Sequence, residues 1–150
     1  MDYNFYMAKA LEEAQLAKNM LETPIGSIIV HEDKIIASAF NQRNTKKSVL
    51  YHAEIIAISK ACEYMGDWRL EGCTIFVTLE PCPMCIGAIL QARMDKLVYG
   101  AKSPKAGSVG SILNVLDNER YNHKVEVVSG IMEKECGEII SNFFAELRKN

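Results

Sequence analysis

Two cysteines separated by two residues stand in the sequence EPCPMCIGAIL, at the start of an apolar run. Cys82 and Cys85 would open a helix, on which residues three apart share a face, so both sulfurs can reach one point. The start of a helix also stabilises negative charge and lowers the pKa of a thiol. This spacing suits a redox dithiol, a structural metal site or a catalytic metal site, so other residues must decide.

The sequence YHAE supplies the ligand type that would complete a metal site. Zinc takes thiolate and neutral imidazole in tetrahedral geometry, and His52 offers the imidazole. A fourth ligand is not at hand, because Cys62 would lie about 15 Å from His52 along one helix. Cys73 would lie about 20 Å or more from Cys82 along a strand. Three protein ligands leave a position for water, which is the arrangement of a catalytic site.

Glu54 stands two positions after His52, and two such residues point about 200° apart on a regular helix. Both can line one pocket only if His52 occupies the first position of the helix. Glu54 would then lie beside the metal ion, where a carboxylate can accept a proton from the water that the ion acidifies. A glutamate in a first turn also simply favours the helix dipole. The neighbouring ligand pattern favours the catalytic interpretation.

The remaining thiols and imidazoles show no ligand spacing. We expect Cys62, Cys73 and Cys136 to be small buried residues, and His31 to belong to a hairpin. Glu80, two positions before Cys82, is expected to do no more than set the turn that leads into the helix.

The elements that must position these residues alternate along the chain after a hairpin. Apolar residues every three or four positions predict a helix over residues 3–21, ended by Pro24 and Gly26. Strands at 28–30 and 35–40 flank the polar link HEDK, as in a β-hairpin. The later segments are predicted as a loop at 41–50, a helix at 52–65, a strand at 74–79, a helix at 83–93, a strand at 96–100, a loop at 103–111, a short helix at 112–117, a strand at 124–129 and a helix at 133–149. This order predicts an α/β layer sandwich.

Composition bounds the function classes. A chain of 150 residues that is 49% hydrophobic can bury one core, so we expect a single domain over residues 1–150. A formal net charge of −2 argues against a strongly basic nucleic-acid wrapper, although not against a local basic patch. No signal core and no run of about 18 apolar residues occur, so we expect a cytoplasmic protein without a membrane partner. Five cysteines without an export signal also make a disulfide framework improbable.

HAE followed by PCPMC resembles the signature of the zinc-dependent nucleobase deaminase superfamily. The likeness continues through TPIGSIIV, FNQRN, WRLEGCTIFVTLEPCPMC, VYGAKSPKAGSVGSILNVL, YNHKVEVVSGI and FFAELR, in order and spacing. Over almost the whole chain, these segments are similar to the bacterial tRNA-specific adenosine deaminases. The zinc motif identifies only the superfamily, whereas the segments after Gly100 indicate the tRNA branch.

The resemblance implies a three-layer α/β/α sandwich with a five-stranded mixed sheet and an N-terminal hairpin, the cytidine deaminase-like fold. It implies one zinc ion per subunit, held by His52, Cys82 and Cys85, with Glu54 carrying protons as adenosine becomes inosine at the wobble position of a tRNA anticodon. It also implies a homodimer whose active site borrows residues from the partner. The residues that the resemblance assigns to the tRNA anticodon stem-loop are Asn41, Ala53, Lys105, Asn122, His123, Phe144 and Arg148.

Each of these RNA contacts also has an ordinary interpretation, as a turn, surface or core residue. Phe143 and Phe144 are adjacent, hence about 100° apart on a helix, so one should be core and the other free to stack on a base. Departures from the family pattern lie between Asn41 and His52 and in the segment AGSVGS. They are Lys46, Lys47, Ser48, Tyr51 and Val109. Since tight RNA binding needs a basic surface, the cations should cluster; they are Lys46, Lys47, Lys102, Lys105, Lys124, Arg148 and Lys149.

Two other functions stay open at this point. A free-base deaminase acting on guanine or cytosine would share HAE and PCPMC, although the segments after Gly100 speak against it. A dithiol redox protein or a structural zinc protein would use Cys82 and Cys85 without needing Glu54.

Overall fold

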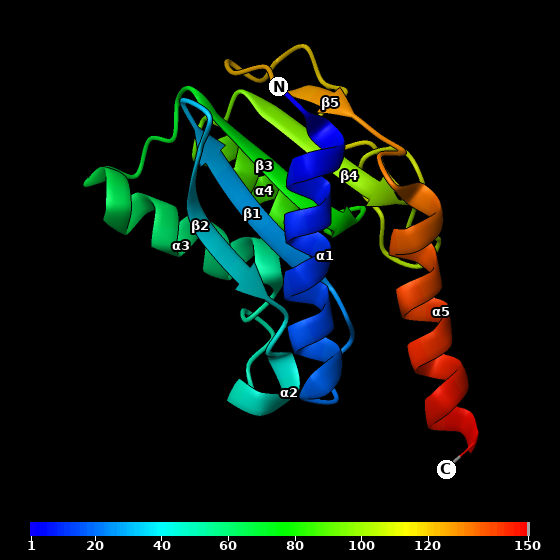
Figure 1. Ribbon diagram of the computed structural model, residues 1–150. Helices are drawn as coiled ribbons and strands as arrows, with labels where there is room; N and C mark the ends of the chain where they lie inside the picture. Colours follow the sequence, from blue (N-terminus) through cyan, green and yellow to red (C-terminus); the bar gives the residue numbers. More distant parts are fainter. Residues whose placement is uncertain (150) are drawn as a thin grey trace.

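A mixed sheet of five strands, in the order β2-β1-β3-β4-β5, forms the middle layer of the computed structural model, which describes residues 1–149 (Figure 1). The strands are β1 Gly26–His31, β2 Lys34–Phe40, β3 Cys73–Leu79, β4 Lys96–Ala101 and β5 Glu126–Val128. β1 is antiparallel to both of its neighbours, whereas β3, β4 and β5 are mutually parallel. The predicted N-terminal hairpin and five-stranded mixed sheet are confirmed.

Helices cover both faces of this sheet, which gives the predicted three-layer α/β/α sandwich (Figure 1). The long helices α1 (Tyr3–Asn19) and α5 (Glu133–Lys149) lie on one face. The opposite face carries α3 (Ala53–Met65) and α4 (Pro83–Gln91). None of the helices in residues 1–149 combines the length and the apolar character that a bilayer crossing requires.

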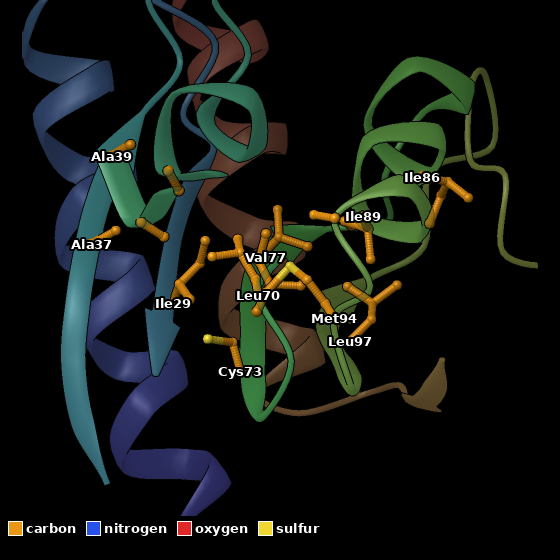
Figure 2. Close-up of a cluster of buried hydrophobic side chains, with 14 of the residues drawn as sticks. Ile29, Ala37, Ala39, Leu70, Cys73, Val77, Ile86, Ile89, Met94 and Leu97 are labelled. Atoms are coloured by element: carbon orange, nitrogen blue, oxygen red, sulfur yellow. The ribbon is translucent and has the colours of Figure 1, made fainter. Parts of the chain in front are cut away.

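The core beneath α3 and α4 fixes the position of α4 against the sheet. Ile86 and Ile89 of α4 are fully buried in one hydrophobic cluster with Ile29, Val77 and Leu97 of the strands, and Ile89 points toward Val77 (Figure 2). Full burial of one such side chain stabilises the fold by about 1.5–3 kcal/mol. The residue before Ile86 is a predicted metal ligand, so this packing also sets where that ligand points.

Close packing of α1 on β1 depends on small residues. Asp2 caps α1, because its side chain accepts a hydrogen bond from the backbone N–H of Phe5 at 3.1 Å. Ala10 and Ala14 are fully buried, and Gly26 of β1 lies directly beneath them. A Cβ at Gly26 would lie 2.0 Å from the carbonyl oxygen of Ala10, so only glycine fits at this contact.

Three strands end at the same edge of the sheet. Because β1 lies between β2 and β3 and is antiparallel to both, β2, β3 and β4 all run in one direction. Asn41 directly follows β2, Cys82 follows β3 after two residues, and Ser103 follows β4 after one. The carboxyl ends of parallel strands are a preferred place for ligand sites. The chemically interesting residues therefore gather at one edge.

Two predicted segments differ from the structure. The expected loop at 41–50 contains a one-turn helix, α2 (Arg43–Lys46). The expected short helix at 112–117 is wrong, because its N–H groups bond back to an earlier loop. Ile112 donates to the carbonyl of Gly107 at 2.9 Å, and Val115 donates to that of Ser108 at 3.0 Å. Hydrogen bonds that reach back five and seven residues have replaced the four-residue spacing of an α-helix there.

The helix over residues 3–21 is also shorter than expected. It ends at Asn19, and Leu21 has a positive φ of 61° and is largely exposed. The backbone N–H of Glu22 instead bonds to the carbonyl of Ala17 at 2.9 Å, which closes the helix. The apolar period in the sequence thus extended two residues past the real end of the helix.

Gly26→Ala should lower the free energy of unfolding by about 3 kcal/mol or more, since overpacking against main-chain atoms cannot relax easily. Gly87→Ala is the matched control, because a Cβ there meets nothing within 4 Å in α4. It should raise stability by about 0.5–1 kcal/mol. Urea unfolding followed by circular dichroism measures both changes. Wild-type stability of Gly26→Ala would contradict the seating of α1 on β1.

Candidate metal centre and substrate pocket

His52 occupies the N-cap position of α3, as its partnership with Glu54 requires. Its backbone is extended, with φ −75° and ψ 150°, and the helix proper begins at Ala53. The His52 ring makes no capping hydrogen bond, so it is free for another partner. Because the His52 backbone is extended, the side chains of His52 and Glu54 need not point about 200° apart, as they would on a regular helix. Both residues line the same pocket.

Cys82 occupies the equivalent position at the start of α4. Its backbone is extended, with φ −78° and ψ 172°, and Pro83 follows in the first turn, where its missing N–H costs nothing. Cys85 lies within that first turn and is fully buried. The two helix starts therefore bring one imidazole and two thiols together, at the positive ends of two helix dipoles.

The three side chains have the spacing of ligands around one ion. Nδ1 of His52 lies 3.7 Å from Sγ of Cys82 and 3.6 Å from Sγ of Cys85, and the two sulfurs lie 3.7 Å apart. Zinc–sulfur bonds of about 2.3 Å and a zinc–nitrogen bond of about 2.0 Å, at tetrahedral angles, would separate two sulfurs by about 3.8 Å and sulfur from nitrogen by about 3.6 Å. The donor set and its edges fit a tetrahedral metal ion.

No fourth ligand joins this group among residues 1–149, where His52, Cys82 and Cys85 are the one cluster with metal-ligand geometry. All five cysteines are free, and Cys73 and Cys136 are buried as predicted. Cys62 is only half-buried, contrary to expectation. It lies at the end of α3 remote from His52, with its sulfur 3.7 Å from the carbonyl of Trp68.

The thiols of Cys82 and Cys85 differ in pKa. The hydrogen bond between the sulfurs lowers the pKa of Cys82 to about 4 and raises the pKa of Cys85 above its ordinary range. A hydrogen bond with Cys82 raises the pKa of His52. Near neutral pH the pair of thiols thus carries one negative charge, and a bound cation would displace the second proton.

Glu54 lies beside these ligands, not among them. Its side chain is 4% exposed and burial raises its pKa to about 7, although the charge of His52 opposes this shift. A carboxyl group that titrates near neutral pH can both accept and release a proton. The structure therefore places a buried carboxyl group of raised pKa next to three side chains that could hold a metal ion.

A cavity of about 150 Å³ opens onto this group. Its floor contains His52, Glu54 and Cys82, and its walls come from the chain after β2 and after β4. The other residues that line it are Thr23, Ile25, Asn41, Arg43, Ala53, Leu79, Glu80, Ser103 and Ala106. The predicted substrate residues Asn41 and Ala53 thus lie in the pocket.

Asn41 is held rigidly at the wall after β2. Its Nδ2 donates to the carbonyl of Thr23 at 3.3 Å, and its Oδ1 accepts from the backbone N–H of Arg43 at 3.2 Å. The amide keeps one further N–H and one lone pair for another partner. Asn41 therefore lines the cavity and also orders the turn after β2.

The sequence-based reasoning missed Glu22, which fixes the same wall. This carboxylate is 1% exposed and accepts from the backbone N–H groups of Asn44 at 3.1 Å and Thr45 at 2.6 Å. It caps the short helix α2 from a distant part of the chain and so orients Arg43, which lines the pocket. Spacing along the sequence gave no signal for this role. Arg43, two residues after Asn41 in FNQRN, could have been suspected.

The other predicted RNA contacts fall into two groups. Lys105 is exposed on the loop after β4. Phe144 and Arg148 are exposed on α5, whereas Phe143 is 4% exposed. The expected division of the two phenylalanines into core and surface is confirmed. Asn122 and His123 do not join the pocket of their own chain.

His123 contacts the opposite edge of the sheet. A ring nitrogen, Nε2, lies 2.6 Å from the carbonyl oxygen of Met94, which precedes β4. The pocket lies beyond the other end of β4, about 17 Å away by strand rise. The predicted basic cluster is divided in the same way, with Lys102 and Lys105 after β4 and Lys124 beside His123.

Comparison with known proteins gives consistent results. Residues 1–148 match the family model of MafB19-like deaminases. The chain is 51% identical over 144 residues to the tRNA-specific adenosine deaminase of Bacillus subtilis (strain 168), covering 96% of this chain and 89% of that protein. A solved structure from work on A-to-I editing by tRNA A34 deaminases has a TM-score of 0.86 and 41% identity, covering 90% of this chain and 98% of the other. A guanine deaminase from Bacillus subtilis has a TM-score of 0.67 and 27% identity, covering 100% and 96%.

The purified protein should contain about one transition-metal ion per chain, because the three ligand atoms lie 3.6–3.7 Å from one another, the separation that ligands around one tetrahedral ion have. His52→Ala and Cys85→Ala should each lose most of this metal after dialysis, and Cys62→Ala should keep it as a matched thiol control. Plasma mass spectrometry of the three variants and wild type provides the measurement. Full metal content in His52→Ala would contradict the assigned ligand set.

Proposed function

Because this chain belongs to the tRNA-specific adenosine deaminase family, we propose that it converts adenosine to inosine at the wobble position of a tRNA anticodon. The observation that carries the proposal is a buried carboxylate, Glu54, beside an open three-ligand metal group at the floor of a cavity. Its substrate serves translation, so we expect the enzyme in the cytoplasm.

We propose that His52, Cys82 and Cys85 hold one zinc ion. The mixed nitrogen and sulfur donors and the tetrahedral edge lengths support zinc over harder cations, which prefer oxygen ligands. When bound, zinc supplies the Lewis acidity that lets a water molecule act as a nucleophile near neutral pH.

Glu54 carries the protons in this reaction. It takes a proton from the attacking water and delivers it to the ring nitrogen next to C6 of adenine. It then helps to protonate the departing amine, so adenosine and water give inosine and ammonia. Burial supports this role, because it holds the pKa of Glu54 at about 7, where donation and acceptance of a proton are both accessible.

The walls of the pocket orient the base. Asn41 retains one amide N–H and one carbonyl lone pair toward the cavity, and these suit the edge or sugar of a nucleotide splayed out of an RNA loop. Ala53 is fully buried at the first turn of α3, where a small side chain leaves room for the ring. The base thus has polar contacts on one side and the catalytic floor beneath it.

Contacts outside the pocket would hold the anticodon loop. Arg43 lies at the wall after β2 and Lys105 lies on the loop after β4, so a phosphate chain crossing the mouth would meet a cation on either side. Phe144, 41% exposed near the end of α5, offers a ring on which a base can stack, with Arg148 one helical turn further on.

A homodimer would account for the two residues at the other edge of the sheet. Asn122 and His123 lie at the far end of β4 from the pocket, and a second copy could present them to RNA bound there. Exposed apolar residues beside the pocket loops support a partner surface, namely Val49, Leu50, Ile112 and Leu113. Light scattering after size-exclusion chromatography tests this assembly.

The rival functions have less support. Similarity to guanine deaminase is weaker than similarity to tRNA adenosine deaminases, at 27% against 51% identity. A redox dithiol would not need His52 at 3.6–3.7 Å from both sulfurs, or a buried Glu54 beside them. Free guanine is therefore the comparison substrate for any activity measurement.

Glu54→Gln should lower kcat for an anticodon stem-loop with adenosine at the wobble position by about 10²–10⁴-fold, the usual contribution of a positioned acid–base group. The metal content should stay at wild-type level, because Glu54 is not a ligand. Inosine is scored by nuclease digestion and mass spectrometry, with guanosine at the wobble position and free guanine as negative controls. Unchanged turnover would remove Glu54 from the mechanism, and activity on guanine alone would refute the proposed substrate.

Arg43→Gln should weaken stem-loop binding and reduce the slope of log Kd against log salt by about 0.7–1, which corresponds to one lost phosphate contact. Arg69→Gln is the control, since Arg69 pairs with Asp67 in the turn after α3. Its salt slope should match wild type. Fluorescence anisotropy with a labelled stem-loop measures both. Equal slopes for Arg43→Gln and wild type would exclude Arg43 from the phosphate contacts.

A further inference from the structure

We propose that Glu80 is a positioning residue whose buried carboxylate fixes residues 103–111, the pocket loop, as one wall of the substrate site and thereby sets the affinity for RNA. This inference rests on the proposed function. It gives Glu80 a role beyond the turn before Cys82 that the sequence suggested.

The Glu80 carboxylate is the centre of the pocket loop. It is 3% exposed, and its Oε1 accepts from the backbone N–H of Ser103 at 3.1 Å and from the hydroxyl of Ser111. Its Oε2 accepts from the backbone N–H groups of Val109 at 2.9 Å and Ser111 at 3.1 Å. Four donors from both ends of one loop thus converge on one side chain.

These hydrogen bonds replace a counter-ion. Glu80 takes part in none of the ion pairs found between residues 1 and 149. A buried carboxylate is costly unless its oxygens are satisfied by donors. The loop conformation that supplies all four donors is therefore strongly preferred over any other, and the charge acts as a template for the chain path.

The loop also closes tightly around the carboxylate. A Cβ at Gly107 would lie 2.4 Å from Cδ and Oε1 of Glu80, so only glycine allows this approach. The backbone N–H of Ser108 donates to the carbonyl of Pro81 at 2.9 Å, next to Cys82. The pocket loop is thus joined both to the Glu80 side chain and to the turn that begins α4.

The pocket loop contributes residues that would contact the substrate, not residues that would hold the metal ion. Ser103 and Ala106 line the cavity, and Lys105 is exposed between them. The metal ligands and Glu54 are held by the starts of α3 and α4 instead. A displaced loop should therefore weaken RNA binding in ground state and transition state alike, which raises KM and leaves kcat unchanged.

Three variants test this role from different sides. Glu80→Gln keeps the size of the side chain but offers one acceptor oxygen in place of two. Gly107→Ala pushes the loop away from the carboxylate while Glu80 and Cys82 themselves are not substituted. Ser111→Ala removes one donor and adds no atoms, so it reports even if the other two variants fold poorly. Asp67→Asn, at a carboxylate in the turn after α3, is the control.

Each variant is assayed for metal content, thermal unfolding, and kcat and KM on the wobble-adenosine stem-loop. We expect Glu80→Gln and Gly107→Ala to raise KM by about 10-fold or more, with kcat within about 3-fold of wild type and full metal content. Ser111→Ala should raise KM by about 2–5-fold, and Asp67→Asn should change nothing. A lower melting temperature with an unchanged KM would show a merely structural role.

The possible failures are distinguishable. If wild type neither binds nor deaminates the stem-loop, the proposed function is refuted, and this inference with it. If wild type is active and the loop variants keep its KM, the inference alone is overturned. A joint loss of kcat and metal in Glu80→Gln, with wild-type KM in Gly107→Ala and Ser111→Ala, would also overturn it, because Glu80 would then act through Cys82.

Discussion

The starts of two helices meet at one point, and the candidate site depends on that meeting. His52 and Cys82 each stand one residue before a helix with an extended backbone, so their side chains point off the helix ends instead of along its sides. Both helices also direct the positive ends of their dipoles at the shared point, which favours thiolate there. The backbone conformation at His52 and Cys82 thus determines where the imidazole and the thiol point.

The mixed sheet makes this meeting possible. The parallel strands β3 and β4 end at the same edge of the sheet. β2 also ends there, because β1 is antiparallel to both β2 and β3. The residues that line the cavity therefore come from the segments after β2, β3 and β4. Burial of Ile86 and Ile89 against the sheet fixes the depth of the floor, so the site inherits its rigidity from the core.

The sequence predicted what local patterns can encode. Apolar period and residue type identified all five strands and the helices of the three layers, because these depend on neighbours within a few residues. The group of His52, Cys82 and Cys85 spans 30 residues or more, and it was identified from ligand types and from the motifs HAE and PCPMC instead. The segment at 112–117 was wrong because its backbone bonds reach back to Gly107 and Ser108. The role of Glu22 was missed because its partners Asn44 and Thr45 lie more than twenty residues away and no motif links them to it. A net charge of −2 likewise could not show where the cations lie.

Both pocket walls are held by carboxylates that grip mainly main-chain N–H groups, through Glu22 on one side and Glu80 on the other. Side chains on these walls that neither donate to the two carboxylates nor pack against them are therefore not needed to maintain the path of the chain. Evolution, or a protein engineer, can exchange residues such as Arg43 or Lys105 to retune substrate preference without rebuilding the scaffold. The fold thus separates the residues that maintain the pocket walls from the residues on those walls that can vary.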